Sequence, residues 1–234
     1  MHLFYNQHIT EQDSSFNFDK DESRHIVKVL RKTIGDTLQI TNGKGWLFNA
    51  ELTLADQKHC SVRIRSKSLQ PKRNYNLHLA VAPTKMNDRY EWFLEKATEI
   101  GIETITPIFC DHSERKIVKL ERFEKIIQSA MKQSLKFTLP KLNKPIKFQD
   151  FLKQDFTEKV CIAHCEDGEK KLLKTVIHPS EKTTILIGPE GDFSSDEIKN
   201  ALEKNCIPIS LGESRLRTET AGLVAVQNIS FINQ

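Results

Sequence analysis

The sequence predicts an α/β protein with a mostly parallel sheet, preceded by a small β-rich domain. Apolar, β-branched runs alternate with helical patterns from residue 75 onward, which is typical of strand–helix–strand units. Two junctions near the C-terminus pass from a strand through a glycine-bearing loop into a helix. Toward the N-terminus, Asn42 and Gly43 stand between two alternating runs, which is a strong hairpin signal. At 234 residues the chain can bury at least one substantial core.

Residues 1–70 are predicted to form a domain of short strands at a spacing that suggests a compact barrel. The expected elements are a short helix at residues 23–30 and strands at residues 37–40, 46–52 and 60–66. Residues 68–74 (Ser-Leu-Gln-Pro-Lys-Arg-Asn) have the composition of a linker. They separate this domain from a second one, residues 75–234.

In the second domain strands and helices are expected to alternate along the chain. The predicted strands are residues 77–82, 104–109, 159–163, 183–187 and 207–211. The predicted helices are one that begins at Asn87 or Asp88 and ends before Gly101, residues 120–136, one that begins near Ser194, and residues 219–232.

Two loops of this domain are candidates for a binding site. The first is Gly188-Pro189-Glu190-Gly191, followed by Ser194 and Glu197 at the spacing of a capping box. The second is residues 212–217, after which Thr218 is predicted to cap the last helix. Both loops follow strands, so they are expected at the carboxyl edge of the sheet, where open α/β sheets bind ligands.

The first loop matches neither the phosphate-binding P-loop nor the Gly-x-Gly-x-x-Gly dinucleotide motif. It is either a tight turn or a stretch of bare backbone that a flat ligand approaches closely. Leu211, Leu216 and Ala221 of the second region are apolar enough to enclose an adenine.

Arg217 lies beside a predicted helix N-terminus, which already carries positive partial charge. A guanidinium there either serves a bound anion or is an ordinary solvated side chain. Glu219 is either an acid of the first helical turn or a catalytic base.

Charge and cysteine content restrict the class of protein. The formal net charge is +4, but residues 112–147 hold ten basic against three acidic residues, which indicates either a surface for a polyanion or a solvated helix face. The five cysteines are scattered, and Cys161-x-x-His164-Cys165 in an apolar run favours buried thiols over a metal site. With neither a membrane-length apolar run nor a signal-peptide pattern, a cytoplasmic protein is expected.

These motifs resemble those of the RsmE family, the 16S ribosomal RNA uridine-N3 methyltransferases. The resemblance rests first on Ile187-Gly188-Pro189-Glu190-Gly191 together with Leu216-Arg217-Thr218-Glu219-Thr220-Ala221. It extends over nearly the whole chain, through residues 25–31, Asn42-Gly43-Lys44-Gly45, residues 95–101 and Lys132-Gln133-Ser134. The chain departs from the family pattern at Ser214-Arg215, where Arg-Ile is common, and at Asp192, where glycine is frequent.

The resemblance implies an N-terminal PUA-like RNA-binding barrel and a C-terminal SPOUT methyltransferase domain with a trefoil knot. It also implies S-adenosylmethionine as methyl donor, a homodimer, no metal, and a uridine of the small ribosomal subunit as substrate. The cofactor contacts carried over by position are Ile187, Gly188, Glu190, Gly191, Ile209, Leu211, Gly212, Leu216, Thr218 and Ala221. Basic residues expected to contact the RNA backbone are Arg24, Arg31, Lys85, Arg89, Arg115 and Lys132.

For catalysis, Arg217 is expected either to stabilise the negative charge that develops on the uracil or to hold a nucleotide phosphate. Glu219 or water is expected to accept the N3 proton. Two other functions remain open at this point. One is a SPOUT enzyme that methylates a different RNA site, and the other is a non-catalytic RNA-binding assembly factor.

Overall fold

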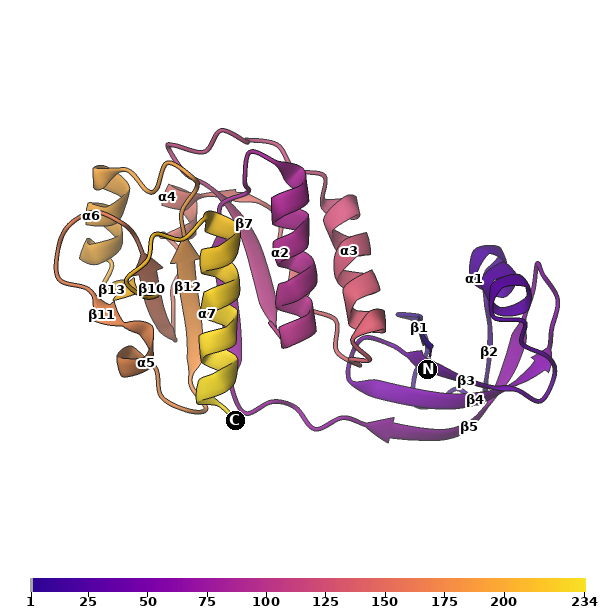
Figure 1. Ribbon diagram of the computed structural model, residues 1–234. Coiled ribbons are helices and arrows are strands. Elements are labelled where there is room, and N and C mark those ends of the chain that lie inside the picture. The colour runs from indigo at the N-terminus through magenta and orange to yellow at the C-terminus, as the bar shows by residue number, and fades with distance from the viewer. Residues whose placement is uncertain (1) are drawn as a thin grey trace. The chain divides into compact units, whose positions relative to one another are not determined.

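The computed structural model describes residues 2–234, and its contacts divide the chain into two compact units (Figure 1). The first unit comprises the chain up to Lys72 together with Met131–Leu139, and the second comprises Arg73–Ala130 and Pro140–Gln234. Residues 131–139 therefore pack with the N-terminal unit. The domain ranges 1–70 and 75–234 inferred from the sequence stay a prediction.

The first unit is built on a curled five-stranded sheet with a mostly apolar interior. Its strand order is β1-β3-β4-β5-β2. The elements are β1 (Leu3–Tyr5), β2 (Ser15–Asn17), α1 (Lys20–Arg24), a π-helical turn η1 (His25–Val29), β3 (Thr37–Thr41), β4 (Trp46–Leu54) and β5 (Ser61–Leu69). Ile26, Ile40, Phe48 and Leu52 are fully buried at its centre. Alternation along β3 and β4 points Ile40, Phe48 and Leu52 to one face, which explains the predicted hairpin.

Three local predictions in this unit were wrong or incomplete. The helix begins at Lys20, not Ser23, because the Asp19 carboxylate accepts a hydrogen bond from the Glu22 amide (2.9 Å) and caps it. Strands β1 and β2 were missed, since three residues are too short for a periodicity to show. β5 runs to Leu69, into the predicted linker.

The second unit contains an eight-stranded sheet in which every strand pair is parallel. The order is β11-β13-β10-β12-β6-β7-β8, with β9 also paired to β7. The strands are β6 (Asn76–Val81), β7 (Thr104–Phe109), β8 (Lys141–Leu142), β9 (Ile146–Lys147), β10 (Lys159–Ala163), β11 (Lys171–Leu172), β12 (Lys182–Ile187) and β13 (Ile207–Ser210). The helices are α2 (Asn87–Ile100), α3 (Leu120–Gln133), α4 (Phe148–Phe151), α5 (Leu173–Val176), α6 (Ser195–Glu203) and α7 (Thr218–Ile232).

Helices cover both faces of this sheet. On one face α7 packs against β6, β12 and α2, and the Tyr90 ring of α2 lies 5.0 Å from the Phe123 ring of α3. On the other face α4 and α6 close a core that includes Phe148, Ile198 and Leu186. The predicted α/β class with a small N-terminal β-rich unit is confirmed.

Two chain connections cross at the carboxyl edge of the sheet. Residues 164–170 lead from β10 past β13 to β11, and residues 211–217 lead from β13 past β10 to α7, which packs on β12 and β6. General topology rules disfavour such crossings on one edge. A trefoil knot requires one, so this arrangement agrees with the fold that the family resemblance implied.

The remaining differences lie at helix ends and in very short elements. Helix α3 ends at Gln133, not residue 136, because Leu135 adopts a left-handed backbone (φ 53°). The elements β8, β9, α4, β11 and α5 have two to four residues each and were not predicted. Among residues 2–234, no helix is both long and apolar enough to cross a membrane.

Candidate functional site

The turn between β12 and α6 forms the first wall of the site. Helix α6 begins with the predicted capping box: the Ser194 hydroxyl accepts from the Glu197 amide (3.3 Å), and the Glu197 carboxylate accepts from the Ser194 amide (3.0 Å). Glu197 is buried and also accepts from the Asp111 amide (3.0 Å). The capping box is therefore confirmed, and it fixes the direction in which the chain leaves the turn.

The loop of residues 211–217 forms the second wall, and here the predicted cap was wrong. Thr218 is already the first helical residue of α7, and Arg217 occupies the N-cap position without a capping side chain. The Thr218 hydroxyl instead donates to the Gly188 carbonyl (3.1 Å). The hydroxyl that the sequence pattern assigned to the helix thus ties α7 to the first loop.

The third wall is the crossing connection at residues 164–170, which the sequence did not indicate as part of a site. The Cys165 amide donates to the Asp192 carboxylate (2.6 Å), and the Ser195 hydroxyl donates to Glu166. Cys165 is exposed, unlike the buried thiol expected from its apolar context, because the strand has ended at Ala163. The signal that could have located this wall is its place directly after a predicted strand.

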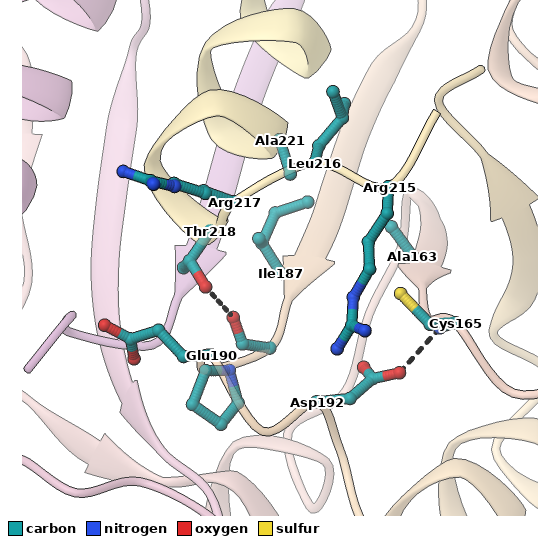
Figure 2. Close-up of a pocket in the computed structure, with 12 residues that line it drawn as sticks. Ala163, Cys165, Ile187, Glu190, Asp192, Arg215, Leu216, Arg217, Thr218 and Ala221 are labelled. Atoms are coloured by element: carbon teal, nitrogen blue, oxygen red, sulfur yellow. Dashed lines mark hydrogen bonds between the residues drawn. The ribbon is translucent and has the colours of Figure 1, made fainter. Parts of the chain in front are cut away.

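The three walls enclose a pocket in two adjoining parts. The smaller part, about 270 Å³, is shown in Figure 2 and is lined by apolar side chains that include Ala163, Ile187, Leu216 and Ala221. The larger part, about 630 Å³, extends along residues 209–216. A combined volume of this order suits a ligand of nucleoside size. Gly212 (φ +142°) has no heavy atom within 4 Å of an added Cβ, so bare backbone borders the larger part.

Nine of the ten residues predicted to contact a cofactor line this pocket. Those in the smaller part are Ile187, Gly188, Glu190, Leu216, Thr218 and Ala221, and those of the larger part include Ile209, Leu211 and Gly212. The exception is Gly191, whose carbonyl accepts a hydrogen bond from the His112 ring (3.0 Å). Its backbone lies so close to His112 that an added Cβ would be 3.1 Å from the His112 Cβ.

The two predicted catalytic residues occupy different surroundings. Arg217 lines the smaller part of the pocket, and Figure 2 shows its side chain extending away from Arg215 and Asp192. Glu219 does not line either part; its side chain is 9% exposed, and its Oε1 lies 3.9 Å from Arg89 Nε of α2. The Glu219 Oε2 is buried without a hydrogen-bond partner among the described residues.

The residues predicted to bind RNA fall in both units. Arg24, Arg31 and Lys132 belong to the first, where Lys132 pairs with Glu22 (3.3 Å). In the second, Lys85 pairs with Glu114 (2.8 Å), and the Arg115 guanidinium donates to the carbonyls of Thr84 (3.0 Å) and Lys85 (2.6 Å). Arg115 thus stabilises the loop between β6 and α2, and its role toward RNA stays a prediction.

Several residues of the pocket were not assigned to the site from the sequence, among them Asp192, Arg215 and His164. Asp192 and Arg215 line both parts, and Figure 2 shows the Arg215 side chain extending toward Asp192. His164 lines the larger part, and burial lowers the pKa of its imidazole. Across residues 2–234 no group of three or more histidine, cysteine, aspartate or glutamate side chains could hold a metal ion.

The chain is similar to known proteins over its full length. A family model described as an RNA methyltransferase domain matches residues 71–230, and one described as an RNA methyltransferase PUA domain matches residues 18–65. A relative from Rickettsia conorii, named ribosomal RNA small subunit methyltransferase E, is 32% identical over 98% of this chain and 95% of its own.

Solved structures agree with these matches. A probable rRNA methyltransferase from Porphyromonas gingivalis has a TM-score of 0.92 and 41% identity, covering 100% of this chain and 98% of its own. A ribosomal RNA small subunit methyltransferase E from Neisseria gonorrhoeae, bound to S-adenosyl methionine, has a TM-score of 0.87 and 27% identity, with coverage of 100% and 98%.

Proposed function

This chain belongs to the ribosomal RNA small subunit methyltransferase E (RsmE) family of RNA methyltransferases, and on that premise we propose that it methylates N3 of a uridine in 16S ribosomal RNA, with S-adenosylmethionine as methyl donor. The observation that carries the proposal is the pocket between the two crossing connections, because nine of the ten residues that the family resemblance implied as cofactor contacts line it.

The lining of the pocket fits S-adenosylmethionine. Apolar side chains of Ala163, Ile187 and Leu216 supply a surface for an adenine ring, and the bare backbone at Gly212 lets a flat group approach closely. The hydrogen bond from Thr218 to Gly188 fixes the two loops relative to each other before any ligand binds. When bound, S-adenosylmethionine supplies an electrophilic methyl group on a sulfonium.

We assign Arg217 to stabilisation of the reacting base. Uridine N3 carries a proton and becomes nucleophilic only as that proton leaves, so negative charge develops on the ring. Arg217 is exposed, lines the smaller part of the pocket and stands at the N-terminus of α7, whose partial positive charge adds to its own. This places two sources of positive potential at one side of the pocket.

We propose that solvent, and not Glu219, accepts the proton that leaves uridine N3. The Glu219 carboxylate is buried against α2, pairs with Arg89 and does not line the pocket. A general base must come within hydrogen-bond reach of the proton it takes, directly or through one water. We propose instead that Glu219 orients Arg89.

The partners proposed for the chain follow from its family and surface. The RNA is presented on the small ribosomal subunit in the cytoplasm, and the basic residues of both units bind its backbone without reading sequence. The active form is a homodimer, and no metal takes part. Exposed apolar side chains of the second unit, among them Trp92 and Phe231, are available for a subunit interface.

The test compares small subunits and naked 16S RNA, both from a strain that lacks the enzyme, as acceptors of tritiated methyl groups. Incorporation that maps to a uridine and blocks primer extension supports the proposal, because N3 methylation prevents Watson–Crick pairing. A methyl group that leaves primer extension intact identifies a different RNA site, such as a ribose hydroxyl. No incorporation, together with no thermal stabilisation by S-adenosylhomocysteine, would identify a non-catalytic RNA-binding factor.

A further inference from the structure

We propose that Asp192 and Arg215 together bind the zwitterionic amino acid end of S-adenosylmethionine, and that this pair lets the site discriminate against adenosine ligands lacking that end. The inference rests on the proposed function, since it concerns the same pocket. It goes beyond that function by assigning cofactor specificity to two side chains, Asp192 and Arg215, that line both parts of the pocket.

The position of the pair supports this assignment. Asp192 and Arg215 are the charged residues that line both parts of the pocket, so they lie where the two parts adjoin. Asp192 comes from the β12–α6 turn and Arg215 from the loop before α7, and Figure 2 shows the guanidinium extending toward the carboxylate. An acid and a base on opposite walls match an α-ammonium and an α-carboxylate carried by one ligand.

Asp192 is held in an unusual conformation that fixes its carboxylate. Its φ of 63° lies in the left-handed region, which is unfavourable for a residue with a Cβ. Its Oδ1 accepts from the Phe193 amide (2.8 Å), and its Oδ2 accepts from the Cys165 amide (2.6 Å). Each carboxylate oxygen has a second lone pair, so the group can still accept from an ammonium.

Arg215 is exposed and has no hydrogen bond or ion pair to any other residue of the described chain, 2–234. The other charged groups in the pocket wall are mostly engaged. Lys170 donates to the carbonyls of His164 (3.2 Å) and Glu166 (2.6 Å), and Glu190 accepts from the Lys85 amide (2.8 Å). Arg215 is therefore the cation free to meet a ligand carboxylate near Asp192.

The experiment measures binding by calorimetry for three ligands that share the adenosine part. S-Adenosylhomocysteine carries both charged groups, decarboxylated S-adenosylhomocysteine carries only the ammonium, and 5′-methylthioadenosine carries neither. For the wild-type protein we expect S-adenosylhomocysteine to bind about tenfold or more tightly than methylthioadenosine, because two charge-assisted contacts are lost.

The variants separate the two contacts. Arg215→Gln should remove most of the difference between S-adenosylhomocysteine and its decarboxylated form, with little effect on methylthioadenosine. Asp192→Asn, which keeps a residue that tolerates left-handed φ, should weaken both ammonium-bearing ligands and leave methylthioadenosine nearly unchanged. Asp192→Gly is the second variant at this position, because glycine removes the backbone strain. Lys199→Gln, a charge change at an exposed position of α6 that lines neither part of the pocket, is the matched control.

The outcomes distinguish failure of the assignment of Asp192 and Arg215 from failure of the proposed function. If the wild type binds all three ligands equally, or if neither variant changes the ratios, the assignment of Asp192 and Arg215 is overturned while the adenosine pocket stands. If none of the three ligands binds, the proposed cofactor site fails and the inference fails with it. Melting temperatures without ligand show whether each variant is folded.

Discussion

Two arginines of one loop, two residues apart in sequence, are given different tasks. In Figure 2 the Arg215 side chain extends toward Asp192, whereas the Arg217 side chain extends away from both Arg215 and Asp192. Sequence motifs located Arg217 but not the role of Arg215, because Asp192, toward which Arg215 extends, lies on a wall distant in sequence. Loops that are distant in sequence come close together only in the folded structure, so a local sequence pattern does not predict their contacts.

Arg217→Ala should lower kcat by about a hundredfold to a thousandfold, the usual effect of removing one electrostatic contact to a developing anion. Affinity for S-adenosylhomocysteine, measured by calorimetry, should stay close to normal. Lys199→Ala, which removes an exposed charge from α6, serves as the control. A rise in KM for RNA with kcat unchanged would instead assign Arg217 to a phosphate.

Glu219→Gln should lower kcat less than about threefold, whereas loss of a general base costs about a hundredfold or more. The reason is that the carboxylate faces Arg89, away from the pocket lining. The pH profile of kcat should also keep its shape. A large fall in kcat, together with loss of the decrease in kcat at low pH that protonation of a general base causes, would make Glu219 the proton acceptor.

His78 links three strands and makes stability depend on pH. Thr184 donates its hydroxyl to Glu158 (2.8 Å) and Asn143 donates to Thr106 (2.8 Å), so a neutral His78 fits by donating to Thr184 and accepting from Thr106. Burial lowers the pKa of His78 from 6.5 to about 4. At pH values between about 4 and 6.5, His78 is therefore protonated in the unfolded chain but neutral in the folded chain.

Stability should therefore fall as the pH drops from 6.5 toward 4, and at pH 5 the loss from this group should be about 2 kcal/mol. Urea unfolding at pH 7 and pH 5 measures it. His78→Gln should be less stable than wild type at pH 7 by about 1 kcal/mol and should lose less between the two pH values. Equal pH dependence in both proteins would contradict the assignment.

At the scale of elements, long helices and β-branched strands were predictable because their periodicity extends over five or more residues. β10 was predicted with the bounds it has, and α2 begins and ends where its signals indicated. The two-residue strands β8, β9 and β11 carry no such signal, since they form only when a neighbouring strand offers its edge. Thr218 shows the same limit, because a tertiary acceptor took the hydroxyl that a local cap would have used.

The contact between α2 and α7 depends on Gly222. A Cβ at this position would lie 2.7 Å from Cε2 of Phe93, so the two helices approach closely only because the side chain is absent. Gly222→Val should destabilise the second unit by about 1–3 kcal/mol through overpacking. Differential scanning calorimetry measures the shift in Tm, and Gln227→Val on the exposed side of α7 should stay within about 0.5 kcal/mol of wild type. If both variants changed the Tm by the same amount, the interface between α2 and α7 would accommodate the added side chain without overpacking.

For the whole molecule, the sequence indicated the α/β class but not the crossing of residues 164–170 and 211–217. Strand order is decided by which edges pair after collapse, and general rules favour uncrossed connections. Only the family resemblance supplied the knot. Residues 131–139 pack with the N-terminal unit. The linker-like composition of residues 68–74 gave no sign of this, because it marks only where the chain passes between the predicted domains.

The last prediction concerns residues 131–139, which pack with the N-terminal unit. The Gly45 amide donates to the Phe137 carbonyl (2.8 Å), the Leu139 amide donates to the Gly43 carbonyl (2.8 Å), and the Thr41 hydroxyl donates to Phe137 (3.0 Å). A fragment of residues 1–72 lacks residues 131–139 and therefore loses these three hydrogen bonds. Its free energy of unfolding should be lower by about 1 kcal/mol for each bond lost. A synthetic peptide of residues 131–139 should raise the Tm of the fragment, measured by circular dichroism, in a concentration-dependent manner. A peptide of the same composition in scrambled order should not. A fragment whose Tm is unaffected by the native peptide would show that residues 1–72 fold as a complete domain.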